Sequence, residues 1–376
     1  MKKVVLIPDS FKGTMSSSEI CRIMSKQIHA LSPDTEIISI PVADGGEGSV
    51  DAFLQAEGGK KVFMAVSGPY GEKVDGYFGI IRDTTAVIEM AACAGFSMAG
   101  DRNRPDIATT YGVGQLIKEA AKKCSKIIVG LGGSCTNDGG AGAAAAAGVK
   151  FFDDDGAEFV PTGGTLSKIC SIDMSGIDEN VKKAEIIAMC DTDIPLFGRY
   201  GAAYIFGPQK GADAGMLEIL DKGLRDFAKT IDKELHVDIS NIPGAGAAGG
   251  MGGGIAAFFG AKLQRGIETV LDTVHFDSVA KDADMVFSGE GRLDFQSLHG
   301  KVIEGVARHT KKLGIPLVVI VGDIGDNIEG IYDCGVSAIF SINRKAIVLS
   351  KAKERSRSDL ALTVDNLMRF FNIIGL

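Results

Sequence analysis

The segment at residues 9–14, DSFKGT, places a carboxylate, a hydroxyl and an ammonium group between an apolar run and a predicted helix. The first N–H groups of a helix have no partner within it and, together with the helix dipole, they attract anions. Asp9, Ser10 and Lys12 are therefore candidates for binding an anionic substrate. The alternative is a polar surface turn with an exposed lysine.

A second segment, ADGGEG at residues 43–48, sets acidic side chains among glycines. Glycine leaves the backbone open to a ligand and allows tight turns. Hard cations such as Mg²⁺ prefer oxygen ligands of the kind that exposed carboxylates supply. We therefore single out Asp44, Gly45 and Gly46, with an acidic glycine turn as the alternative.

The most glycine-rich loop is GLGGSCTNDGG at residues 130–140, between an apolar run and an alanine-rich stretch. Backbone N–H groups in such a loop can surround phosphate oxygens. The loop is not a Walker A motif, since G-x-x-x-x-G-K-[ST] occurs nowhere in the chain. A flexible connector is the weaker alternative. The candidate ligand-binding residues here are Gly132, Gly133, Ser134, Asn137 and Asp138.

Two further acids, Asp191 and Asp193, follow a predicted strand in CDTD at residues 190–193. Side chains two residues apart point in the same direction if the chain remains extended. One of these carboxylates can bind a metal ion or accept a hydroxyl proton. The segment FGPQKG at residues 206–211 comes next and contributes Lys210. The alternative is a loop that caps the following helix.

The segment GEGRLD at residues 289–294 holds an arginine between acids. The planar guanidinium of Arg292 can bind a carboxylate or phosphate through two parallel hydrogen bonds. Glu290 is the neighbouring candidate, and a local ion pair is the alternative. The segment GAGAAG at residues 244–249 matches the dinucleotide fingerprint literally. That fingerprint must follow a strand directly. Here Asn-Ile-Pro intervenes, which disfavours oxidoreduction.

These segments recur in one arrangement, in which a β-branched run leads into a polar or glycine-rich loop and then into a helix-period stretch. Alternating strands and helices favour an α/β fold with a largely parallel sheet. Ligands of such folds bind beyond the carboxyl ends of the strands, where all these loops should lie. The predicted strands are residues 4–7, 36–40, 126–129, 185–189, 284–287 and 316–321.

The middle of the chain has a different pattern. Residues 61–66, 74–81 and 85–90 are strand-like and too close together for helices to lie between them, which predicts antiparallel or mixed pairing. We therefore expect a discontinuous parallel-sheet domain at residues 1–73 and 283–376, with a second α/β domain of mixed sheet inserted at residues 74–282.

Composition excludes several classes of protein. The 376 residues carry a net charge of −8 without a basic patch, so we expect no nucleic-acid partner. Seven cysteines without CxxC spacing predict reduced, mostly buried thiols in a cytoplasmic protein, and no zinc site. No apolar run suits a membrane span. The residues indicate small-molecule ligands and do not define an oligomeric state.

The six segments at residues 9–13, 43–48, 132–140, 206–211, 244–254 and 289–292 together resemble the bacterial glycerate kinase type-1 family, in family order and nearly end to end. The resemblance implies a flavodoxin-like domain built from both chain ends, ATP, Mg²⁺, and phosphorylation of D-glycerate to phosphoglycerate, usually the 2-phosphate rather than the 3-phosphate. Two residues depart from the family pattern. Ile194 replaces a usual asparagine, and Cys135 replaces a small apolar residue.

On this resemblance we expect residues 132–134 and the next helix to hold the nucleotide phosphates, and Asp191 or Asp193 to hold Mg²⁺. Lys12 and Arg292 would neutralise the glycerate carboxylate and the moving phosphoryl group. Asp44 or Asp191 would accept the hydroxyl proton. The expected nucleotide set is Gly132, Gly133, Ser134, Asn137, Asp138 and Lys210; the expected substrate set is Asp9, Ser10, Lys12, Gly45, Gly46, Glu290 and Arg292. The alternatives are a kinase for another small hydroxy acid, and a non-catalytic protein that binds ATP or a sugar acid.

Overall fold

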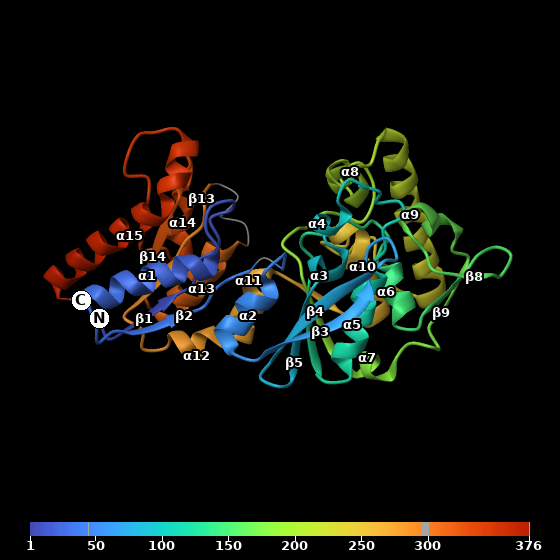
Figure 1. The fold of residues 1–376 in the computed structure, drawn as a ribbon, viewed down its shortest axis with the longest axis horizontal. Helices are drawn as coiled ribbons and strands as arrows, with labels where there is room; N and C mark the ends of the chain where they lie inside the picture. The colour runs from blue at the N-terminus through green and yellow to red at the C-terminus, as the bar shows by residue number, and fades with distance from the viewer. Residues whose placement is uncertain (44, 295–300, 376) are drawn as a thin grey trace. The chain divides into compact units, whose positions relative to one another are not determined.

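The computed structural model describes residues 1–43, 45–294 and 301–375, and the chain divides into two compact units (Figure 1). Unit 1 comprises Met1–Ala43, Gln55–Glu57 and Ile267–Leu376; unit 2 comprises Asp44–Leu54 and Gly58–Gly266. These edges differ from the expected 1–73, 74–282 and 283–376. Residues 60–67 pair into the sheet of unit 2, and the helices that follow residue 266 belong to unit 1.

Unit 1 is built on a five-stranded parallel sheet with the order β16-β14-β12-β1-β2. Counted along the chain, this order is 2-1-3-4-5, which is that of flavodoxin-like folds, so the expected fold class is confirmed. The four predicted strands of this unit are also confirmed, with small shifts at their ends, and β16 is a fifth strand that the sequence analysis did not predict. The bounds are β1 Lys3–Leu6, β2 Glu36–Ser39, β12 Met285–Ser288, β14 Leu317–Val321 and β16 Ala338–Ser341.

Helices cover both faces of this sheet. Alternate strand residues such as Leu6, Phe287 and Ile320 pack with α1 and α15 into one buried core. The intervening residues, such as Val286 and Val319, are equally buried on the other face, where α13 contacts β12 and β14. The helix bounds are α1 Ser17–Leu31, α11 Gly266–Thr273, α12 Phe276–Ala280, α13 Val302–Leu313, α14 Gly330–Cys334 and α15 Leu349–Ile374; the short strands β13 Arg292–Leu293 and β15 Asp323–Ile324 pair with each other.

A serine hydroxyl caps the start of α1. Ser16 is the N-cap, and its hydroxyl accepts a hydrogen bond of 3.2 Å from the Glu19 backbone N–H. The Glu19 carboxylate accepts hydrogen bonds from the guanidinium of Arg357 on α15, 338 residues along the chain. The start of α1 is therefore tied to the last helix by a contact that the local sequence does not reveal.

Unit 2 contains a six-stranded mixed sheet with the order β11-β10-β6-β5-β4-β3. β3, β4 and β5 pair antiparallel, as their spacing predicts, and β5, β6, β10 and β11 pair parallel. A separate small sheet has the order β8-β7-β9. The bounds are β3 Lys60–Ser67, β4 Lys73–Ile81, β5 Thr85–Glu89, β6 Lys126–Gly130, β7 Lys150–Phe152, β8 Glu158–Phe159, β9 Ser171–Asp173, β10 Glu185–Met189 and β11 Lys262–Gln264.

The helices of unit 2 pack closely because many of their residues are small. A Cβ atom on Gly114 of α5 would lie 2.2 Å from the Ala143 carbonyl oxygen of α6, so this helix pair requires glycine. The bounds are α2 Ser49–Glu57, α3 Ala91–Ala94, α4 Phe96–Ala99, α5 Tyr111–Ala121, α6 Ala141–Ala146, α7 Glu179–Lys183, α8 Ala202–Phe206, α9 Ala214–Leu235 and α10 Ala247–Phe259, with 3-10 turns at Gly163–Lys168 and Pro208–Lys210.

The run GAGAAG does not have the setting of a dinucleotide site. Residues 236–239, which precede it, are irregular rather than a strand, and the run leads into α10. All seven cysteines are free, and five of them are buried. Among the described residues, no helix is both long and apolar enough to cross a membrane.

Candidate active site

Two predicted loops of unit 2 meet at the carboxyl ends of β6 and β10. The Gly132 N–H donates a hydrogen bond of 3.0 Å to the Gly45 carbonyl oxygen. A Cβ atom on Gly130 would lie 2.3 Å from that same oxygen, and Gly45 adopts a φ of +80° against Gly130 and Met189. Glycine is therefore required where these two backbones cross. Gly45, Gly46 and Gly132 thus share one strand edge, while Asp44 lies outside the described residues.

A buried glutamate fixes the far end of the same loop. Glu89, at the end of β5, is fully buried. Its carboxylate accepts a hydrogen bond of 2.9 Å from the Ser49 N–H at the start of α2 and one of 2.5 Å from the Tyr77 hydroxyl. Burial raises the pKa of Glu89, and these two hydrogen bonds oppose that shift. The α2 N-cap, Gly48, has no side chain to cap the helix, so Glu89 supplies the acceptor from another strand.

The carboxylate of Asp138 maintains the shape of the glycine-rich loop. It is fully buried and accepts hydrogen bonds from the N–H and hydroxyl of Thr110, at 2.7 and 2.8 Å, and from the N–H groups of Gly140 and Gly142, at 3.1 and 3.3 Å. Burial raises its pKa, and these donors oppose the shift. Asp138, expected to bind nucleotide, therefore directs its carboxylate into the protein and fixes the start of α6.

Lys210 lies beneath the loop, almost completely buried. Its Nζ donates a hydrogen bond of 3.1 Å to the Ser134 hydroxyl and one of 2.6 Å to the Thr136 carbonyl oxygen. Burial lowers the pKa of Lys210 to about 8, because the charged form loses hydration. The sequence placed Ser134 and Lys210 in one set, and the structure brings them into contact although 76 residues separate them.

Asn137 adds unused hydrogen-bonding capacity to this cluster. Its side chain is fully buried, and neither amide atom has a partner among the described residues; the same holds for the Thr136 hydroxyl. Buried polar groups without partners are rare and costly, and they mark places where a water molecule or ligand is missing. An ammonium group, an amide and two hydroxyls around a glycine loop suit a phosphate group, so this cluster fits ATP.

The glycine run at the start of α10 packs against the loops that follow β6 and β10. A Cβ atom on Gly249 would lie 2.1 Å from the Thr136 carbonyl oxygen, and Gly249 has a φ of +69°. Gly246 donates 3.0 Å to the Ile194 carbonyl oxygen through its N–H. The interaction of Ile194 with Gly246 uses the backbone alone, so it does not depend on the asparagine usual at this position.

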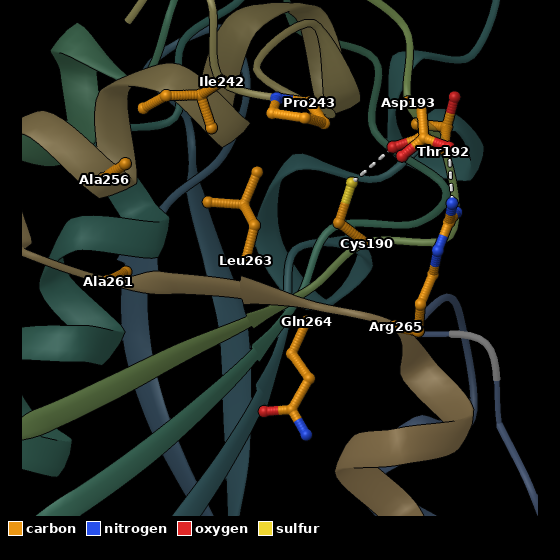
Figure 2. A pocket seen from close by; sticks show the side chains of 10 residues that line it. All are labelled: Cys190, Thr192, Asp193, Ile242, Pro243, Ala256, Ala261, Leu263, Gln264 and Arg265. Atoms are coloured by element: carbon orange, nitrogen blue, oxygen red, sulfur yellow. Dashed lines mark hydrogen bonds and ion pairs between the residues drawn. The ribbon is translucent and has the colours of Figure 1, made fainter. Parts of the chain in front are cut away.

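The loop after β10 carries Asp191 and Asp193 beside a pocket of about 290 Å³ (Figure 2). Asp191 Oδ1 accepts 2.7 Å from the Gly266 N–H, and Asp193 Oδ2 pairs with the guanidinium of Arg265 at 2.5 Å. The pocket has an apolar wall and a polar rim; it is lined by Cys190, Thr192, Asp193, Ile242, Pro243, Ala256, Ala261, Leu263, Gln264 and Arg265.

Arg265 was not predicted from the sequence. It follows β11, a strand of only three residues, and no motif surrounds it. The available signal was an arginine between a short strand and the first residue of a helix, α11. Burial raises the pKa of the Cys190 thiol, and the charges of Asp191, Arg265 and Asp193 also act on it, which places all three near this sulfur.

The remaining predicted residues gather in unit 1, at the carboxyl ends of β1 and β12. The Asp9 N–H donates a hydrogen bond of 2.8 Å to the Gly289 carbonyl oxygen. A Cβ atom on Gly291 would lie 3.4 Å from the backbone nitrogen of Lys12. Arg292 is mostly exposed and lies 3.8 Å from Asp323. The predicted site residues therefore divide between the two units. Those in unit 1 are Asp9, Ser10, Lys12, Glu290 and Arg292. Those in unit 2 are Gly45, Gly46, Gly132, Gly133, Ser134, Asn137, Asp138, Asp191, Asp193 and Lys210.

The acids of unit 2 fit a magnesium ion that is held mainly by phosphates. Within residues 1–43, 45–294 and 301–375, no three His, Cys, Asp or Glu side chains gather into a metal cage. Mg²⁺ commonly takes only one or two carboxylates together with water and substrate phosphates. Asp191 and Asp193 meet that requirement; Asp191 accepts a hydrogen bond from the Gly266 N–H, and Asp193 pairs with Arg265.

Comparisons with known proteins agree with this architecture. A model of the Glycerate kinase family matches residues 4–372. A glycerate kinase of Bacillus cereus is 41% identical over 374 residues, with 99% of this chain and 98% of that protein covered. A glycerate 2-kinase of Escherichia coli is 44% identical over 343 residues, with 90% of each chain covered.

A crystal structure of a candidate glycerate kinase 2 from Salmonella typhimurium LT2 superimposes with a TM-score of 0.89 at 38% identity. The superposition covers 100% of this chain and 99% of the Salmonella chain. Membership of a kinase family implies ATP as a substrate. The chain therefore belongs to the glycerate kinase family and is an enzyme of the kinase class.

Proposed function

We propose that this enzyme transfers the γ-phosphoryl group of ATP to D-glycerate and that 2-phosphoglycerate is the product. The observation that carries the proposal is the buried cluster of Lys210 with Ser134 and Asn137 of the glycine-rich loop, which follows β6, the strand paired with the β10 that leads to Asp191. The name of the Escherichia coli relative, glycerate 2-kinase, supports the 2-position.

The chemistry requires mainly positioning and charge stabilisation. A bond forms between the glycerate hydroxyl oxygen and the γ-phosphorus, the bond from that phosphorus to the β,γ-bridging oxygen breaks, and ADP leaves. The Lys210 ammonium and the Asn137 amide hold phosphate oxygens, while Asp138 keeps the loop in the required shape. Lys12 and Arg292 remain the candidates for neutralising the glycerate carboxylate and the moving phosphoryl group.

The hydroxyl proton passes to a carboxylate, for which Asp44 and Asp191 are the candidates. The hydrogen bond of 2.7 Å from the Gly266 N–H fixes the orientation of the Asp191 carboxylate. Asp191 and Asp193 would hold Mg²⁺, which when bound neutralises charge on the phosphates.

The direct test is an assay of ADP release with ATP, Mg²⁺ and D-glycerate, followed by NMR of the product. We expect glycerate-dependent ADP release, and coupling of phosphorus to the proton on carbon 2. Coupling to the two protons on carbon 3 would identify the 3-phosphate instead. Asp191→Asn should lower turnover by a factor of about 10² or more while thermal unfolding is unchanged.

The alternatives predict different results in the same assay. Turnover only with other small hydroxy acids would keep the kinase chemistry and replace the substrate. Stabilisation of the fold by ATP without ADP release for any acid would identify a binding protein instead.

A further inference from the structure

The pocket beyond β10 and β11 in Figure 2 sets a cation at the rim of an apolar wall. Ile242, Pro243 and Leu263 form much of the wall, and Arg265 reaches from the end of β11 toward Asp193. Its volume of about 290 Å³ is at the lower end of the range of ligand pockets, about 300–1,000 Å³. A space of this size suits a small acid rather than a whole nucleotide.

We propose that Arg265 binds the carboxylate of the hydroxy-acid substrate in this pocket and thereby restricts the enzyme to small 2-hydroxy acids. The inference rests on the proposed function and deepens it. It assigns to Arg265 of unit 2 the role that the sequence suggested for Arg292 of unit 1.

The charge arrangement of the pocket supports this assignment. Arg265 is fixed at the rim by Asp193, at 2.5 Å, but the Asp193 side chain is 67% exposed. An ion pair in contact with water contributes little, so a second carboxylate can compete for the guanidinium. The apolar wall excludes water from a substrate in the pocket, and a lower local dielectric strengthens its ion pair with Arg265.

The position of Asp191 adds the second requirement of a hydroxy acid. Arg265 and Gly266 are consecutive residues, and they hold Asp193 and Asp191 respectively. The cation for the carboxylate, Arg265, lines the pocket, and the acceptor for the hydroxyl proton, Asp191, is hydrogen-bonded to the next backbone position without lining it. A 2-hydroxy acid carries its two functional groups on adjacent carbon atoms, so its hydroxyl would lie directly beside the carboxylate that Arg265 binds.

The test compares two substrates in two variants. D-glycerate is compared with its neutral amide, each as a substrate and as a competitive inhibitor, in wild type and in Arg265→Met. The wild type should prefer glycerate by a factor of about 10²–10³, since the guanidinium forms a charged, bidentate pair with a carboxylate and not with a neutral amide. Arg265→Met should lose that preference, with kcat/KM for glycerate falling about 10²-fold, the amide changing less than about threefold, and KM for ATP unchanged.

Arg292→Met is the matched comparison. It should lower kcat/KM for both substrates by the same factor and keep the preference for glycerate. Arg265→Lys should recover part of the preference, because it restores the charge without the planar fork. Thermal unfolding of each variant reports whether it is folded, and if Arg265→Met does not fold, the lysine variant and Arg265→Gln decide the question.

Each result has one meaning. A preference for glycerate that persists in a folded Arg265 variant, or that is lost in Arg292→Met instead, would overturn the assignment of Arg265. A wild type that accepts both substrates equally would also overturn it. A wild type inert with every acid would refute the proposed function itself, which is a separate outcome because it precedes any variant.

Discussion

Both units place charged groups at the carboxyl ends of parallel strands, but they surround these groups differently. In unit 2, Lys210 and Asp138 are 3% and 0% exposed, and each is held by several short hydrogen bonds. In unit 1, the side chains of Arg292 and Asp323 are 64% and 51% exposed and lie 3.8 Å apart. The same sheet geometry therefore produces a rigid, dehydrated cluster in one unit and a hydrated, adjustable one in the other.

This difference in burial gives the charged groups of the two units different electrostatic roles. A buried charge is oriented before the substrate arrives, and its field is not screened by water, so it can stabilise developing charge strongly. An exposed charge is screened by salt and rearranges at little cost, so it attracts and admits anions more than it holds them. We expect substitutions in the two units to have effects of different size and different salt dependence.

The largest effect should follow Lys210→Met. Removal of the buried ammonium should lower kcat/KM for ATP by a factor of about 10³, because the phosphates lose a dehydrated cation. Stability should be unchanged or higher, since methionine fills the space without the cost of a buried charge. Steady-state kinetics and urea unfolding measure the two quantities. A variant with activity within threefold of wild type would remove Lys210 from the site and end the contrast between the units.

The next largest effect should follow Glu89→Ala. The substitution leaves the Ser49 N–H and the Tyr77 hydroxyl without acceptors in a buried place and opens a cavity, which should cost about 3 kcal/mol in the free energy of unfolding. KM for glycerate should rise as well, because the loop at Gly45 loses its anchor. Glu89→Gln is the control, since its amide can still accept from Ser49. Equal losses in both variants would show that the negative charge matters and not the shape.

A smaller effect should appear in the pH dependence of the free energy of unfolding and of kcat/KM for ATP. Lys210 has a pKa of about 8 in the folded protein and an ordinary value of 10.5 in the unfolded chain. Between these values the unfolded chain binds more protons, so the contribution of Lys210 to stability rises with pH. Phosphate binding needs the charged form, so kcat/KM for ATP should fall over the same range.

Urea unfolding and kinetics at pH 7.5, 8.5 and 9.5 check these opposite slopes, with Lys210→Met as the reference. Both slopes should differ from those of the variant, in which no ammonium titrates at this position. Identical pH profiles in the two proteins would show that Lys210 does not titrate near 8.

The smallest effect should follow Asp323→Ala in unit 1. An exposed ion pair contributes about 0.2–1 kcal/mol, so the free energy of unfolding should change by less than about 1 kcal/mol. Raising the salt concentration should reduce even that difference. A loss comparable to that of Glu89→Ala would mean that the charges of unit 1 are as firmly fixed as those of unit 2.

The sequence predicts the strands well because their signal is local. The β-branched runs at residues 126–129 and 185–189 become β6 and β10 with almost the same ends. The glycine loops are also foreseeable, since alternating glycine and polar residues have few structural uses. The close spacing of residues 61–90 correctly predicts antiparallel pairing for the same local reason.

The site is less predictable because its contacts join distant residues. The role of Arg265 follows from its ion pair with Asp193, 72 residues away, and that of Glu89 follows from its hydrogen bonds with Tyr77 and Ser49. The orientation of Asp138 toward Thr110 depends on how α5 packs against α6. No periodicity or motif reports such pairings, because they arise from tertiary packing.

The discontinuity of unit 1 has a consequence for synthesis. All of unit 2 has been made when residue 266 leaves the ribosome, whereas β1 and β2 must wait for β12, β14 and β16. Chains grow at about 5–20 residues per second, so the ribbon of β1 and β2 exists for roughly 10–50 seconds before β12 is made. During this interval the first strands are the part of the nascent chain most exposed to misassembly, and a pause in translation after residue 266 would lengthen that exposure.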